Sequence, residues 1–239
     1  MKRLLFILFS ICLMNCEDKQ SHKNKNANTP ISDSLTVNQN NELQKPQTTI
    51  QKTPKRKYPL LTDKNAMEFF LQYEKEHKEQ KVRLITDFGN IDILLFNETK
   101  FHRANFIYLT KQGYFDNTQF YRVIENYIIQ GGSTDDRDVM RKRKKIGKYL
   151  LPTDTKRGFK HDRGVISMPS SDIDNPYKLA SPYEFFITLR DVYQLDGDYT
   201  IFGKVINGLD VCDKIAEVET DDGDWPLQNV YIRKVEILE

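Results

Sequence analysis

The chain has 239 residues and a formal net charge of only +2 at pH 7, because 36 Lys and Arg residues nearly balance 34 Asp and Glu residues. This length permits one large domain, or one domain with an appendage. The balanced charge creates no global field that would attract nucleic acid or an anionic membrane.

The first residues resemble a secretion signal. The positive pair Lys2-Arg3 precedes an apolar stretch, Leu4–Met14, which is too short to span a bilayer comfortably. The stretch ends at Leu13-Met14-Asn15-Cys16, which resembles a bacterial lipobox. The resemblance implies a signal peptide over residues 1–15, a lipid on Cys16 and a lipid-anchored location in a bacterial cell envelope, on its periplasmic or surface face. A plain secretory signal is the alternative.

Two segments of different character come next. Residues 16–62 are rich in Asn, Gln, Lys, Thr and Ser and hold few large apolar side chains. They cannot bury enough surface to offset the entropy lost on ordering, so we predict a disordered tether. Residues 63–80 place Met67, Phe70 and Leu71 at helical spacing, which predicts a helical extension.

The C-terminal two thirds of the chain reads mainly as short strands. Residues 82–86 and 91–96 alternate around a Gly-Asn turn, as in a β-hairpin. Helical spacing recurs at 101–112 and at about 210–217, and residues 230–238 read as a last strand. Mostly short strands with two helices favour a closed barrel over alternating strand and helix units.

One hairpin in this region contains a cation in apolar surroundings. Residues 120–132 read FYRVIENYIIQGG, with a turn at Asn126. Period-two alternation places Phe120, Arg122 and Ile124 on one face of the first strand. A buried arginine here must find a partner, because an unpaired buried charge is very costly. The alternative is an ordinary strand whose arginine points to solvent.

This hairpin also carries a family resemblance. Residues 120–124 (FYRVI) and 127–132 (YIIQGG) resemble the signature of the cyclophilin-type peptidyl-prolyl isomerases. Further blocks follow in the family's order: GVISM at 164–168, EFFI at 184–187, LDG at 195–197 and FGKV at 202–205. The resemblance covers about residues 81–239. It implies that they form an isomerase domain, a closed eight-stranded antiparallel β-barrel capped by two α-helices.

The resemblance implies catalysis without a covalent nucleophile, metal or cofactor. Rotation about an X–Pro bond faces a barrier of about 18–20 kcal/mol, and the twisted amide nitrogen gains an available lone pair. Arg122 is the candidate donor to that nitrogen. Gln130 is the candidate partner of the substrate backbone. The remaining substrate-binding candidates, chosen by their positions in the motifs, are Tyr127, Ile128, Pro169, Ser170, Glu184, Phe186, Leu195 and Tyr199.

The implied partners are proline-containing client polypeptides and, through the lipid, a membrane. Nucleic acid is not expected as a partner, and the chain is expected to be a monomer.

Several positions depart from the family pattern. Glu184 stands where glutamine is common, Tyr199 where histidine is common, and Gln194 where tryptophan or histidine is often found. The segment Ser171–Pro182 is longer than usual. These departures keep open a second function, that of a peptide-binding envelope chaperone with weak or no isomerase activity.

The polar connection from Ser133 to Arg163 contains five consecutive cations, Arg141–Lys145. Such a run usually marks a solvated loop. The alternative is a basic rim that attracts anionic client chains or lipid headgroups.

Only one cysteine, Cys212, would remain in the mature domain if the signal is removed and Cys16 is lipidated. One thiol cannot form an internal disulfide. Since Cys212 lies in an apolar-periodic stretch, Leu209–Ile215, we predict a small buried hydrophobic residue rather than a catalytic thiol.

Overall fold

The computed structural model of the protein describes residues 56–171 and 173–239. The predicted signal peptide, Cys16 and most of the predicted tether therefore lie outside the described residues. Eight of the described strands are β2 (Lys81–Thr86), β3 (Gly89–Leu95), β4 (Thr118–Ile124), β5 (Ile128–Ser133), β7 (Val165–Met168), β8 (Phe185–Thr188), β9 (Thr200–Asn207) and β10 (Val230–Leu238).

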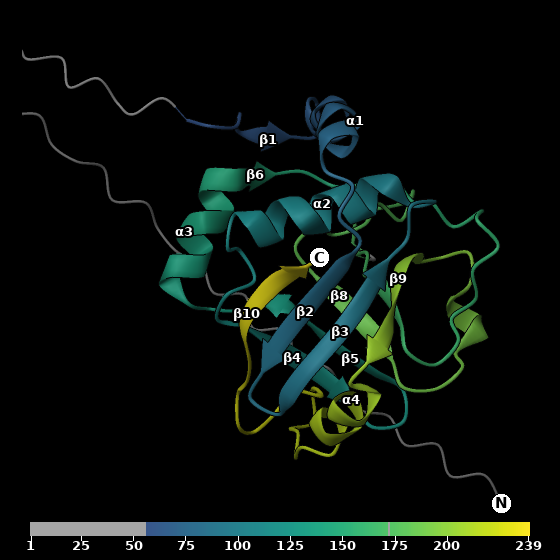
Figure 1. Ribbon diagram of the computed structural model, residues 1–239. Helices are drawn as coiled ribbons and strands as arrows, with labels where there is room; N and C mark the ends of the chain where they lie inside the picture. The colour runs from purple at the N-terminus through teal and green to yellow at the C-terminus, as the bar shows by residue number, and fades with distance from the viewer. Residues whose placement is uncertain (1–55, 172) are drawn as a thin grey trace, which may run out of the picture. The chain divides into compact units, whose positions relative to one another are not determined.

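These eight strands close into one antiparallel barrel in the order β10-β2-β3-β9-β7-β8-β5-β4 (Figure 1). The closed eight-stranded barrel predicted from the sequence is confirmed. Closure leaves no open edge in this sheet. It also brings β4, β5, β8, β7 and β9 side by side, although they are far apart in the chain.

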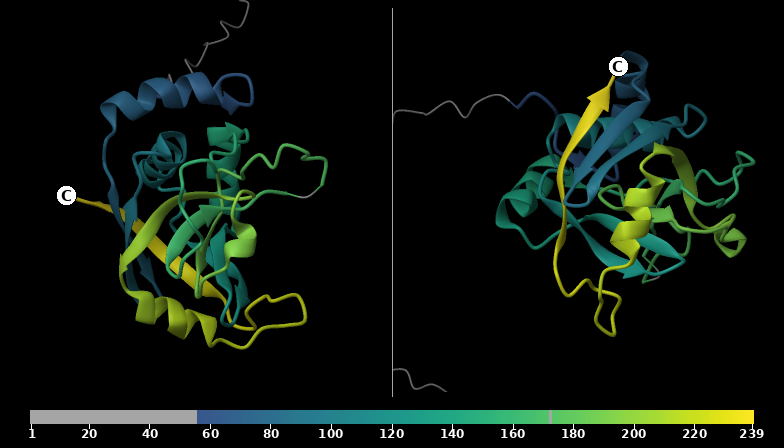
Figure 2. Two further views of the ribbon diagram at one scale, coloured as in Figure 1. Left: turned by 90° about the vertical axis from the view of Figure 1, so that its right-hand side faces the viewer. Right: turned by 60° about the horizontal axis from the view of Figure 1, so that its bottom comes forward.

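Two helices cover opposite ends of the barrel, α2 (Lys100–Lys111) and α4 (Leu209–Ala216) (Figures 1 and 2). Each turns an apolar face toward the strands. Phe106 of α2 stacks on Phe115, with ring centroids 4.6 Å apart, and meets Phe185 edge-on at 5.7 Å. Cys212 of α4 is fully buried, and burial raises the pKa of its thiol to about 12. The prediction of a small buried hydrophobic residue is confirmed.

The predicted extra helix is present as α1 (Ala66–Glu76), which packs on α2. A buried arginine of α2 fastens the end of this segment. Arg103 donates from Nη1 to the carbonyl oxygens of His77 at 2.9 Å and Glu79 at 3.2 Å. Its Nη2 lies 3.6 Å from the Glu74 carboxylate. Because Arg103 is only 1% exposed, these contacts satisfy a charge that would otherwise be costly to bury.

The chain before α1 forms a short strand, β1 (Leu61–Thr62), which pairs in parallel with β6 (Gly147–Lys148). Leu61 is fully buried. The predicted disordered tether, which runs to residue 62, is therefore wrong for these two residues. The close approach of the two backbones requires a glycine, since a Cβ at Gly147 would overlap the Leu61 carbonyl oxygen.

The basic connection predicted as a solvated loop contains a helix, α3 (Arg137–Ile146). The Asp136 side chain caps it by accepting from the backbone N–H groups of Asp138 at 2.8 Å and Val139 at 3.0 Å. Three of the five cations, Arg143, Lys144 and Lys145, fall in the last turn, where they complement the helix dipole. The loop prediction is therefore wrong, because the cations mask the apolar positions that anchor the helix.

Candidate active site

Five cross-strand neighbours form a row on the face of the sheet that lies opposite the core. Arg122 of β4 pairs with Gln130 of β5, and Gln130 pairs with Phe186 of β8. Phe186 in turn pairs with Ser167 of β7, and Ser167 with Ile201 of β9. Directly opposed residues share a face. The barrel therefore places three predicted site residues, Arg122, Gln130 and Phe186, next to one another.

A β-bulge sets the direction of the arginine. Phe120 pairs with Gly131 and Arg122 with Gln130, so Tyr121 is an extra residue in β4. Phe120 is 1% exposed, whereas the Arg122 side chain is 43% exposed. The prediction that Phe120 and Arg122 share a face is wrong, because a bulge resets the alternation of side chains along a strand.

Among the described residues, the Arg122 side chain has one hydrogen-bond partner, on a distant loop. Its Nε donates to Oδ2 of Asp224 at 3.1 Å, and the Asp224 carbonyl oxygen accepts the backbone N–H of Val123 at 2.8 Å. Asp224 adopts a left-handed φ of 65°, within a turn that Asp221 holds by accepting the N–H of Trp225 at 2.9 Å. The two terminal nitrogens of Arg122 make no hydrogen bond with any described residue, so they are available to a ligand.

A second chain of contacts fixes Gln130. Its amide nitrogen donates to the hydroxyl oxygen of Tyr121, and that hydroxyl donates to Oε2 of Glu184 at 3.3 Å. Burial, reinforced by the Glu184 charge, raises the pKa of Tyr121, so the hydroxyl keeps its proton. Since a carboxylate only accepts, the direction of the chain is set, and the Gln130 carbonyl oxygen remains as an acceptor for a ligand.

Aromatic and polar contacts on two sides hold the Phe186 ring, which is 3% exposed. Tyr199 meets it edge-on at 5.6 Å, and His161 stacks on it at 6.1 Å with an interplanar angle of 11°. His161 is fixed by Asp196 at 2.8 Å and by the Ser167 hydroxyl at 3.1 Å. Burial lowers the pKa of His161 against the opposing effect of Asp196. These contacts hold the Phe186 ring rigidly, with a small part of its apolar surface open to solvent.

The other predicted site residues lie outside this row. Ile128 is buried at the start of β5, and the Pro169 carbonyl, just after β7, accepts the N–H of Ser181 at 2.8 Å. The Ser170 hydroxyl is buried and has no partner among the described residues. Tyr127 precedes β5, and Leu195 ends a 3-10 turn, η1 (Tyr193–Leu195). In the described part of the chain neither contacts Arg122, Gln130 or Phe186 through a hydrogen bond or a ring contact.

Three contributors to the site were missed by sequence reasoning, namely Tyr121, Asp224 and Trp225. The Tyr121 and Trp225 rings lie 5.8 Å apart, and Trp225 is 41% exposed beside the Arg122–Asp224 pair. A signal existed for Trp225, the only tryptophan of the chain. Asp224 lies 102 residues from Arg122 in the sequence, so no local pattern joins them.

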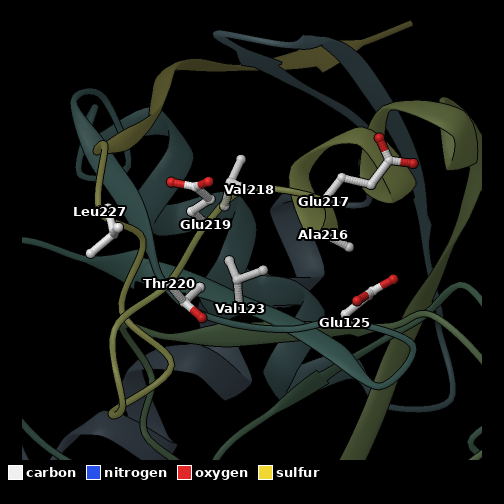
Figure 3. Close-up of a pocket in the computed structure, with 8 residues that line it drawn as sticks. All are labelled: Val123, Glu125, Ala216, Glu217, Val218, Glu219, Thr220 and Leu227. Carbon is white, nitrogen blue, oxygen red and sulfur yellow. The ribbon is translucent and has the colours of Figure 1, made fainter.

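Figure 3 shows a separate pocket of about 540 Å³ at the C-terminal end of α4. None of the predicted site residues lines it. Its lining combines three glutamates, Glu125, Glu217 and Glu219, with the apolar Val123, Val218 and Leu227. Val123, which lines this pocket, directly follows Arg122 in β4 and is buried. Within residues 56–171 and 173–239, no group of three His, Cys, Asp or Glu side chains is arranged to hold a metal ion.

Comparison with known families finds one matching description. The family described as "Cyclophilin type peptidyl-prolyl cis-trans isomerase/CLD" matches residues 81–237. A Rhizopus delemar protein, "Peptidyl-prolyl cis-trans isomerase-like 2", is 36% identical over 69% of this chain and 30% of its own length. A Dictyostelium discoideum protein, "Peptidyl-prolyl cis-trans isomerase-like 3", is 34% identical over 65% of this chain and 94% of its own length.

The relatives differ in how much of them this chain spans. The match covers less than a third of the Rhizopus protein and 31% of a Caenorhabditis elegans relative, "Peptidyl-prolyl cis-trans isomerase 4". Among solved structures, a Cryptosporidium parvum cyclophilin type peptidyl-prolyl cis-trans isomerase has a TM-score of 0.57 and 30% identity. That match covers 67% of this chain and 98% of the other. A second structure of the same protein was determined in the presence of the dipeptide Ala-Pro.

These relatives correct one prediction. They come from fungi, a nematode, a slime mould and a plant, which contradicts the predicted bacterial envelope location. That prediction is wrong, because it depended on a four-residue motif ending at Cys16, which a short apolar stretch can contain by chance. Among the described residues, no helix is both long enough and apolar enough to span a bilayer.

Proposed function

Because this chain belongs to the cyclophilin-type peptidyl-prolyl cis-trans isomerase family, we propose that it accelerates rotation about X–Pro bonds in extended or unfolded polypeptides. The observation that carries the proposal is the Arg122 guanidinium, which Asp224 holds at Nε and which keeps two terminal nitrogens free beside Gln130 and Phe186. A site of this kind supports catalysis that forms no covalent bond to the protein.

The chemistry needs a donor that acts only on the twisted amide. In the planar amide the nitrogen lone pair is shared with the carbonyl, so the nitrogen accepts no hydrogen bond. At the twist the lone pair is released, and a terminal N–H of Arg122 donates to it. Since this bond exists only near the transition state, it lowers the barrier without tightening ground-state binding.

The rest of the row holds the substrate while the bond turns. The small exposed part of the Phe186 ring, which His161 and Tyr199 hold in place, packs against the apolar pyrrolidine ring. The free carbonyl oxygen of Gln130 accepts a backbone N–H of the substrate. One side of the X–Pro bond is thus anchored while the other swings, which makes rotation productive.

A protease-coupled assay with a proline-containing peptide tests the proposal. We expect the wild-type chain to raise the isomerisation rate above the uncatalysed rate, and Arg122→Ala to lower kcat/KM by about 100-fold. An Arg163→Ala variant is the matched control. Arg163 lies outside the row, and its guanidinium pairs with the Asp213 carboxylate at a distance of 2.6 Å. A wild-type rate equal to the uncatalysed rate would reject the proposal.

A further inference from the structure

Helix α3 presents separate faces to the barrel and to solvent. Val139 and Ile146 are buried, and Lys142 between them donates from Nζ to the Gly113 carbonyl at 2.6 Å. These three side chains anchor the helix to the body of the protein. A neighbouring stripe of the helix contains Met140, Arg143 and Lys144, at i, i+3 and i+4 spacing, and these residues are not among the anchors.

Those neighbouring positions line a groove of about 540 Å³ between α3, β1 and the two residues after β6, Tyr149 and Leu150. The floor includes the rings of Tyr149 and Tyr183, each 2% exposed. Three large apolar side chains at its margin are unusually open to solvent, namely Leu60 at 46%, Met140 at 47% and Leu150 at 39%. Single exposed apolar residues are ordinary, but three around one groove indicate a binding surface.

The charged side chains around the groove are mostly positive. Arg143, Lys144 and Lys148 line it, and none of them makes an ion pair with a described carboxylate. The Arg143 guanidinium instead lies over the Tyr183 ring, 4.6 Å from its centroid. Among the described residues that line the groove, the only acidic one is Asp63, whose Oδ1 already accepts the N–H of Leu150 at 2.9 Å. The groove therefore combines an apolar interior with an unbalanced positive rim.

We propose that this groove binds an acidic polypeptide segment that inserts a bulky apolar side chain. The positive rim complements carboxylates on either side of that side chain, and the volume lies in the range of small-ligand sites. A flat anionic membrane would touch the rim cations and leave the concave interior empty. Single-stranded nucleic acid stacks on exposed aromatic rings, whereas the two floor tyrosines are buried.

The groove is an addition to the isomerase barrel. Its wall at Leu60–Asp63 lies before residues 81–237, which match the family. It meets the candidate active site only through Ser181–Tyr183, directly before Glu184. Binding there is therefore separable from the X–Pro reaction, and the proposal does not rest on it.

Fluorescence anisotropy with a labelled peptide tests the proposal on the full chain. The probe carries a central Leu-Leu pair with glutamates on both sides. One companion peptide replaces the glutamates with lysines, and another replaces the leucines with serines. We expect saturable binding of the first peptide alone. In the doubly substituted variant Lys144→Glu, Lys148→Glu we expect affinity for it to fall by about tenfold or more.

A doubly substituted variant of the same charge change, Lys81→Glu, Lys204→Glu, is the matched control, since both lysines are exposed and lie outside the groove. It is expected to bind the peptide like wild type. Equal loss in both variants would assign the effect to net charge and overturn the proposal. Absence of wild-type binding to the peptide would also overturn it, as would binding to phosphatidylserine vesicles with none to the peptide.

Discussion

Arg122 and Asp224 form a half-exposed ion pair, with side-chain exposures of 43% and 38%. Pairs of this kind contribute little to stability, because water screens them and ordering two side chains costs entropy. Their value here is directional. Occupying Nε turns the terminal nitrogens of the guanidinium toward the row that contains Gln130 and Phe186, and a left-handed backbone at Asp224 is tolerated to achieve this.

Replacing Asp224 tests this directional role. We expect Asp224→Asn to lower kcat/KM for a proline-containing peptide by about two- to fivefold while the free energy of unfolding changes by less than about 1 kcal/mol. Asp213→Asn removes a similar exposed pair with Arg163 and is expected to leave kcat/KM unchanged. Equal activity of Asp224→Asn and wild type would show that the negative charge of Asp224 is not needed to position the arginine.

At the scale of single residues, the sequence was informative where the site is local. Arg122, Gln130 and Phe186 were found because each lies in a short motif on its own strand. Asp224 was not found, since its contact depends on a loop conformation and a bulge that no periodicity reports. Alternation along β4 misassigned the face of Arg122 for the same reason.

Among the elements, the segment before the barrel is bound by side chains from two directions. The Tyr58 ring meets Tyr73 of α1 at 6.0 Å and Tyr108 of α2 at 5.3 Å. The β1–β6 pair adds backbone contacts between the two segments. These contacts require a residue without a side chain at position 147, and Gly147 adopts a φ of 141° there. The N-terminal segment and α3 therefore support each other.

Gly147→Ala tests this mutual support. The added Cβ overlaps the Leu61 carbonyl oxygen, so β1 must leave β6, and we expect a loss of about 2–4 kcal/mol in the free energy of unfolding by urea. Gly158→Ala is the control, because Gly158 also has a positive φ, 81°, but nothing lies within 4 Å of an added Cβ. We expect it to cost about 1 kcal/mol. Equal costs would show that the β1–β6 contact contributes nothing.

Helix prediction succeeded for α2 and α4 and failed for α3, for a physical reason. Each of the first two buries a continuous apolar face against the barrel, and such a face produces a regular helical spacing of apolar residues in the sequence. In α3 only Val139 and Ile146 are buried apolar residues, and the remaining anchor is a lysine. Its cap at Asp136 was the signal that composition obscured.

On the scale of the whole molecule, burial of His102 links stability to pH. This histidine of α2 is 1% exposed, and neither ring nitrogen has a partner among the described residues. Burial lowers its pKa from 6.5 to about 4, against the opposing effect of Asp154. The unfolded chain therefore binds more protons than the folded chain between these values, and stability falls as the pH is lowered through this window.

We expect the free energy of unfolding to fall by about 2 kcal/mol between pH 7 and pH 5 through His102, measured by urea denaturation. His102→Leu removes the titrating group and should lessen the decline in the free energy of unfolding by that amount. The decline that is left in this variant is expected to come from His161, whose pKa is also lowered. Parallel declines in wild type and His102→Leu would contradict this assignment.

Barrel closure is what makes a site from scattered motifs. The strands β4, β5, β8, β7 and β9 are neighbours in the barrel in that order. Residues 122, 130, 186, 167 and 201 therefore lie in one row across them. The barrel and this row agree with the fold expected from the sequence blocks. The groove beside α3 forms because Leu60–Asp63 meet residues 140–150, and none of the sequence motifs of the family resemblance includes either segment.

The most direct test of the account is exchange NMR on an Ala-Pro peptide with a catalytic amount of the chain, which observes cis–trans interconversion without a coupling protease. The account predicts exchange cross-peaks between the cis and trans forms with wild type and with Asp213→Asn, and none with Arg122→Ala. Undiminished exchange with Arg122→Ala, or no exchange with wild type, would contradict it.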